Sequence, residues 1–196
     1  MTTPAMTDQQ LIYYSGEHLM HELSMLWELA EILPQRKAST ETSALVESFG
    51  VHLRTLIDFF YREGRLDDVT AQDFLDATTT WKPAEPAALS KAHQRANKEL
   101  SHLTQARISG SPPRKEWNTA ALLKEIDTVA KEFAAKASTK KLHPDVLKFL
   151  NLAPHATVKW IAANVSHSNV ATSFATSTTI GNVSTATQII TKLPQK

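Results

Sequence analysis

The sequence predicts an all-α protein, an up-and-down bundle of about five helices followed by a Ser/Thr-rich C-terminal appendage. Apolar residues recur at steps of three and four over long stretches before residue 140, as they do on the buried face of a helix. Prolines and polar linkers separate those stretches. We therefore divide the chain into a helical-bundle domain, residues 1–140, and a C-terminal extension, residues 141–196, formed by a short helix and a Ser/Thr-rich tail.

The first predicted helix covers residues 12–33 and carries one buried stripe. Pro34 ends it, because a proline inside a helix removes a hydrogen bond and clashes with the preceding turn. The stripe consists of Ile12, Leu19, Leu23, Leu26, Ala30 and Leu33.

The second predicted helix, residues 41–61, has two adjacent apolar rows and so belongs in the middle of the bundle. Gly64 follows as a C-terminal stop, and Asp67, Asp68 or Thr70 is the expected cap of a short third helix. The rows are Leu45, Phe49, Leu56 and Phe59, and Val46, Leu53, Ile57 and Phe60.

The remaining elements follow the connector "WKPAEP", whose two prolines forbid a continuous helix. Pro86 suits the start of the fourth helix, which ends before "SGSPPRK". The fifth helix covers residues 118–137, and "HPDVLKFL" predicts one further short turn. The inward residues are Leu89, Ala92, Ala96, Leu100 and Leu103 on the fourth helix, and Leu122, Ile126, Val129 and Phe133 on the fifth.

Residues 152–196 differ in composition, because their only charged residues are Lys159, Lys192 and Lys196. Gly181-Asn182 lies between β-branched residues and could form the turn of a β-hairpin. A disordered Ser/Thr-rich tail is equally compatible with this composition.

The overall composition limits the classes of function. The net charge is +1, which gives no bulk reason to expect nucleic acid or an anionic membrane as a partner. The absence of cysteine excludes disulfides, thiolate metal sites and cysteine nucleophiles. "MTTPAMTDQQ" does not resemble a secretory signal, and no apolar stretch approaches the ~20 residues that span a bilayer. We expect a cytoplasmic protein without a membrane partner.

The fourth helix carries a pair of residues suited to phosphodiester chemistry. Arg95 and His102 are seven positions apart and so leave the helix from nearly the same face. A neutral histidine can accept a proton from a ribose hydroxyl, and a guanidinium can stabilise charge on phosphoryl oxygens. The alternative is a solvated flank of the helix on which Arg95 pairs with Glu99 at i,i+4.

Two further clusters contain histidine. His52 falls in an apolar row of the second helix, where a hydrogen-bonded core histidine is the usual outcome, and Arg54 is placed to pair with Asp58. "GEHLMHEL" contains Glu17, His18, His21 and Glu22, a spacing that can bind metal. A metal site in a bundle needs matching ligands on other helices, and the later helices contain a single such spacing, Glu99 and His102, so we expect neither a metal nor another cofactor.

Residues 7–137 resemble the HEPN superfamily of small, all-α bacterial proteins. The segments that carry the resemblance are "ALVESFGVHLRTLIDFFY" and "RANKELSHLTQAR", the latter similar to the superfamily's Arg-x(4–6)-His motif. The resemblance implies a metal-independent endoribonuclease of a defence or toxin–antitoxin system, with Arg95 and His102 as its catalytic residues. It also implies a homodimer, RNA as substrate, and an antitoxin-like protein partner.

The binding candidates around this pair are Asn97, Lys98 and Arg107, with His52 and Arg54 on the second helix. The residue after the motif arginine is Ala96, where the superfamily often has a polar residue. Many superfamily members are not catalytic, so a helical dimerisation or partner-binding module is the alternative function.

Overall fold

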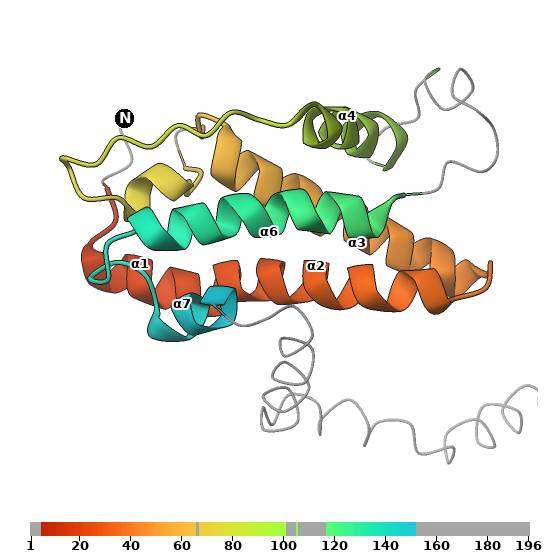
Figure 1. Cartoon of the computed structure of the whole chain (residues 1–196), viewed down its shortest axis with the longest axis horizontal. Coiled ribbons are helices and arrows are strands. Elements are labelled where there is room, and N and C mark those ends of the chain that lie inside the picture. Colours follow the sequence, from red (N-terminus) through yellow and green to blue (C-terminus); the bar gives the residue numbers. More distant parts are fainter. Residues whose placement is uncertain (1–4, 66, 101–104, 106–116, 152–196) are drawn as a thin grey trace, which may run out of the picture. The chain divides into compact units, whose positions relative to one another are not determined.

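A computed structural model describes residues 5–65, 67–100, 105 and 117–151 (Figure 1). These residues form helices and connecting segments and contain no strand, so the predicted all-α class is confirmed. None of the helices in this part of the chain combines the length and apolar character that crossing a bilayer requires. The predicted hairpin or disordered tail lies outside the described residues.

The first predicted helix consists of consecutive helical pieces. They are α1 (Asp8–Tyr14), a π-helical turn η1 (Ser15–Leu19), α2 (Met20–Ile32) and a final 3₁₀ turn η2 (Leu33–Gln35). It begins a turn earlier than predicted, because Thr7 and Gln10 form a capping box. The η1 turn is anchored by Ser15, whose buried Oγ donates to the Ile12 carbonyl and accepts from the His143 backbone N–H, each at 3.0 Å.

The central helix α3 (Thr40–Tyr61) starts at Ser39, whose side chain accepts from the Thr42 N–H. Its predicted apolar rows are buried from Phe49 onward, whereas Leu45 and Val46 are only partly buried. The helix ends when Arg62 becomes extended, two residues before the predicted stop at Gly64. No described glycine has a positive φ, so a left-handed cap does not end this helix.

The segment after α3 forms η3 (Ala71–Phe74), a 3₁₀ helix with a capping box between Thr70 and Asp73. Next come α4 (Ala87–Arg95), which follows Pro86, and its π-helical continuation η4 (Ala96–Leu100). The later helices are α6 (Thr119–Lys136), capped by Asn118, and α7 (Pro144–Asn151).

Helix α6 packs against both α2 and α3, while α4 lies on α3 (Figure 1). Phe133 of α6 lies at the centre of an aromatic cluster and is fully buried. Helix α7 lies beyond residue 140, where the predicted bundle domain ends. It packs on α6 and η1, and the ring centroids of Phe149 and Trp27 are 5.8 Å apart. The rings around Phe133 are Phe59, Phe60, Phe74 and Trp81, with centroids 5.5 to 5.9 Å from it.

Candidate binding groove

Arg95 is held within its own helix and by a neighbouring aromatic ring. Its Nε lies 2.9 Å from a carboxylate oxygen of Glu99, and its guanidinium carbon lies 4.2 Å from the ring centroid of Trp117. The side chain is only 22% exposed. The predicted i,i+4 pair of Arg95 with Glu99 is confirmed, but the prediction of a solvated flank is wrong, because the two side chains are only 22% and 19% exposed. His102 and Arg107, the other motif residue and a predicted binding residue, lie outside the described residues.

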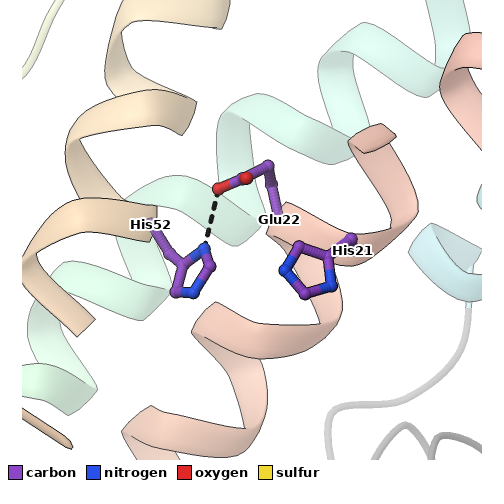
Figure 2. Close-up of side chains that lie close together, drawn as sticks. All are labelled: His21, Glu22 and His52. Atoms are coloured by element: carbon purple, nitrogen blue, oxygen red, sulfur yellow. Dashed lines mark hydrogen bonds and ion pairs between the residues drawn. The ribbon is translucent and has the colours of Figure 1, made fainter. Parts of the chain in front are cut away.

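His52 points into the bundle and is hydrogen-bonded there, as predicted. Its Nδ1 lies 2.8 Å from Glu22 Oε2, a bond that joins α3 to α2 (Figure 2). The His52 side chain is 12% exposed and that of Glu22 25% exposed. His21 approaches the same place, with its ring centroid 5.5 Å from that of His52 and the two rings close to perpendicular. The "GEHLMHEL" cluster therefore separates, since His18 instead contacts Tyr14 with ring centroids 4.9 Å apart.

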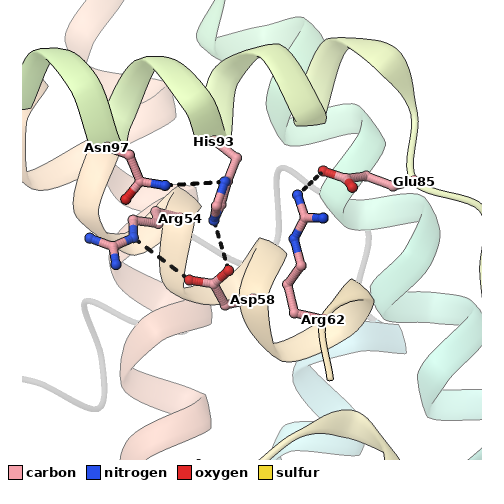
Figure 3. Close-up of polar contacts among 6 residues, drawn as sticks. All are labelled: Arg54, Asp58, Arg62, Glu85, His93 and Asn97. Atoms are coloured by element: carbon pink, nitrogen blue, oxygen red, sulfur yellow. Dashed lines mark hydrogen bonds and ion pairs between the residues drawn. The ribbon is translucent and has the colours of Figure 1, made fainter. Parts of the chain in front are cut away.

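A second polar network joins α3 to α4 (Figure 3). Asp58 Oδ1 lies 2.7 Å from His93 Nε2, and Asp58 Oδ2 lies 3.7 Å from Arg54 Nε, which confirms the predicted Arg54–Asp58 pair. The amide nitrogen of Asn97 lies 3.3 Å from His93 Nδ1. Because a carboxylate oxygen only accepts, the His93 Nε2–H donates to Asp58.

Sequence reasoning missed His93 as a site residue. It lies four residues before Asn97, a spacing that places side chains on one flank of a helix, here of α4 and its continuation η4, and that can be recognised in the sequence. The partner Asp58 lies 35 positions earlier in the chain, and no local spacing predicts that contact.

The network lines an open groove of about 880 Å³, formed by the turn at η1, by α3, by the segment after α3 and by α4. Arg54 pairs with Asp58, and Arg62 pairs with Glu85 at 3.0 Å, so both guanidinium groups already have carboxylate partners. The described lining contains three arginines, Arg54, Arg62 and Arg65, and five carboxylates, Glu22, Asp58, Glu63, Asp67 and Asp68. Counted over these arginines and carboxylates, the described lining has an excess of negative charge.

Tyr14 also lines the groove, and its pKa is raised. Burial raises the pKa of its phenol, and the negative charges of Glu22 and Asp68 raise that pKa further. The direction is that expected for a phenol that would have to ionise beside carboxylates.

The arrangement is better suited to binding than to proton transfer. Both ring nitrogens of His93 have partners, so the histidine can act as a base only if the Asn97 amide leaves Nδ1. The same contacts hold α4 against α3 and give the groove a defined wall.

Comparisons with models of known families, with curated proteins and with solved structures find no match for this chain. The predicted resemblance to the HEPN superfamily is therefore not tested by these comparisons.

Proposed function

We propose that this chain is a non-catalytic, HEPN-like helical module that binds a basic segment of a partner protein in the groove beside α3 and α4. The observation that carries the proposal is the five carboxylates that line the groove against three arginines. A cleft lined by one sign of charge raises the local concentration of ligands of the opposite sign and steers them to the site.

The same charges disfavour RNA as the ligand of this groove. A nucleic-acid backbone carries a negative charge at each phosphate, and its binding depends on lysine and arginine side chains that neutralise those charges. Here Arg62 is hydrogen-bonded to Glu85 at 3.0 Å, and Arg54 forms an ion pair with Asp58 at 3.7 Å. A lysine- or arginine-rich peptide would instead be attracted to the groove, because the negatively charged Asp67 and Asp68 are both exposed there.

The polar network supports binding by holding the groove in shape before a ligand arrives. The Asp58–His93 contact links α3 to α4, and Asn97 fixes the other side of the imidazole. A site whose walls are already ordered loses less conformational entropy when it binds.

The test uses two fluorescein-labelled synthetic peptides, one rich in lysine and arginine and one in which glutamate replaces those residues. Binding to the full chain is followed by fluorescence anisotropy at low and at physiological salt. The groove variant is Asp67→Asn with Asp68→Asn, and the matched control is Glu28→Gln with Glu31→Gln, two exposed carboxylates of α2 outside the groove.

We expect the basic peptide to bind and the acidic one not to bind. Two lost charges at roughly 0.5 kcal/mol each should weaken binding of the basic peptide about fivefold in the groove variant. The control should bind like the parent protein. Equal weakening in the groove variant and the control would mean diffuse charge attraction, and the proposed groove would be wrong.

The second candidate is the metal-independent endoribonuclease that the HEPN resemblance implies, acting as a homodimer with Arg95 and His102. The observation in its favour is that Arg95 lies in a helical segment that continues from α4 into η4. The π-helical winding of η4 differs from the 3.6 residues per turn on which the seven-residue spacing depends. The test is cleavage of mixed cellular RNA in EDTA by the parent protein, Arg95→Ala and His102→Ala. Cleavage that is lost in both variants would replace our proposal with the nuclease; no cleavage by folded parent protein would exclude it.

A further inference from the structure

We propose that His21, Glu22 and His52 form a binding site for a divalent ion of the zinc type between α2 and α3. The three side chains come from two helices and converge on one place (Figure 2). Each offers one ligand atom, and these atoms all lie within 4.8 Å of one another. The site is separate from the proposed peptide function, although Glu22 also borders the groove.

The spacing is close to what a tetrahedral ion needs. Ligand atoms at about 2.0–2.1 Å from zinc lie roughly 3.3–3.5 Å from one another. His52 Nδ1 and Glu22 Oε2 are 2.8 Å apart and would have to separate slightly. His21 would have to approach them, and its exposed side chain leaves room for a change of rotamer.

The donor set points to zinc rather than to magnesium or calcium. Two imidazole nitrogens and one carboxylate oxygen suit zinc, whereas the harder cations prefer oxygen ligands. Three protein ligands leave a fourth position for water. His52 and Glu22 are largely buried, which strengthens their attraction to a cation, and the exposed His21 provides a path for the ion to enter.

A structural ion pair between His52 and Glu22 is the competing explanation. That pair already satisfies one nitrogen and one carboxylate oxygen without a metal, and bringing in the ion means giving up their hydrogen bond. His21 distinguishes the two explanations, because its ring lies nearly perpendicular to that of His52 with the centroids 5.5 Å apart. A purely structural pair has no strong need for a histidine at position 21, whereas the metal site needs its nitrogen.

The experiment uses the full chain without an affinity tag, stripped of metal with EDTA and then freed of EDTA. Calorimetry with Zn²⁺ measures stoichiometry and affinity, and the visible absorption of added Co²⁺ reports tetrahedral coordination by protein ligands. The variants are His21→Gln, Glu22→Gln and His52→Gln, with Glu28→Gln as the matched control on an exposed face of α2. Far-UV circular dichroism checks that each variant is folded.

We expect one Zn²⁺ per chain and a tetrahedral Co²⁺ spectrum for the parent protein and the control. Loss of a residue that only supports a metal ligand typically weakens metal affinity by about 10- to 100-fold. Loss of His21, Glu22 or His52, each a direct ligand, should weaken Zn²⁺ binding by at least that much. His21→Gln decides the question even if His52→Gln fails to fold, because His21 is exposed. Absence of Zn²⁺ binding by the parent protein, or unchanged binding by His21→Gln, would overturn the site.

Discussion

The contact between His93 and Asp58 should contribute measurably to holding α4 on α3. The perturbation is a double-mutant cycle with His93→Gln, Asp58→Asn and the combination of both. The two atoms lie 2.7 Å apart, and the His93 side chain is 15% exposed while that of Asp58 is 42% exposed. A cycle isolates their pairwise coupling from the other contacts that each residue makes.

The magnitude follows from the bond and its exposure. A hydrogen bond to a charged group contributes about 1.5–3 kcal/mol to stability. Exposed ion pairs contribute only about 0.2–1 kcal/mol because water screens them. Because Asp58 is partly exposed, we expect a coupling free energy of about 1 kcal/mol, at the top of the range for exposed ion pairs and below the range for hydrogen bonds to charged groups. In a domain of this size, that corresponds to about 2–4 °C in Tm.

The assay is urea unfolding followed by far-UV circular dichroism and tryptophan fluorescence, with a check that all variants share one m-value. The matched control is a cycle on Glu63 and Lys82, whose charged atoms are 3.6 Å apart but whose side chains are 94% and 82% exposed. We expect no measurable coupling there. A coupling for His93 and Asp58 within the additivity error of about 0.3–0.5 kcal/mol would refute the claim that this network fixes the groove.

Three further predictions test the packing, the electrostatics and a helix cap. Phe133→Ala should lower the free energy of unfolding by about 3–5 kcal/mol, because a fully buried ring among four aromatic neighbours is removed; Phe133→Leu should cost less in the same urea assay. Burial, and then the charges of Glu125, Glu132 and Glu85, raise the pKa of Tyr61 to about 12 from 10.0. The unfolded phenol therefore ionises first, so stability should fall between pH 10 and about 12, and Tyr61→Phe should remove that part of the fall; an unchanged pH profile would contradict it. Asn118→Ala should cost about 1 kcal/mol at the start of α6, where the side chain accepts from the Ala121 N–H at 3.1 Å; Asn118→Ser, which can still cap, should recover most of the loss.

Much of the helical architecture was predictable because its signals are local. The spacing of Phe49, Leu53 and Leu56 marks the buried face of α3 whatever packs on it. Pro34 and the capping residue Thr70 likewise act within one turn of their own position. The π-helical turn at Ser15 was not predicted, and neither was the hydrogen bond that its side chain accepts from the His143 backbone N–H, 128 positions away.

The sequence by itself determined which face of each helix is polar and which is buried. It also determined the local pairs Arg95–Glu99 and Arg54–Asp58, because residues four apart are neighbours on any helix. Only the tertiary structure decided that His52 meets Glu22 and that His93 meets Asp58, across 30 and 35 positions of chain. A helical period specifies the direction in which a side chain leaves its helix. The axial register and the identity of the facing helix depend on how all the apolar faces pack together.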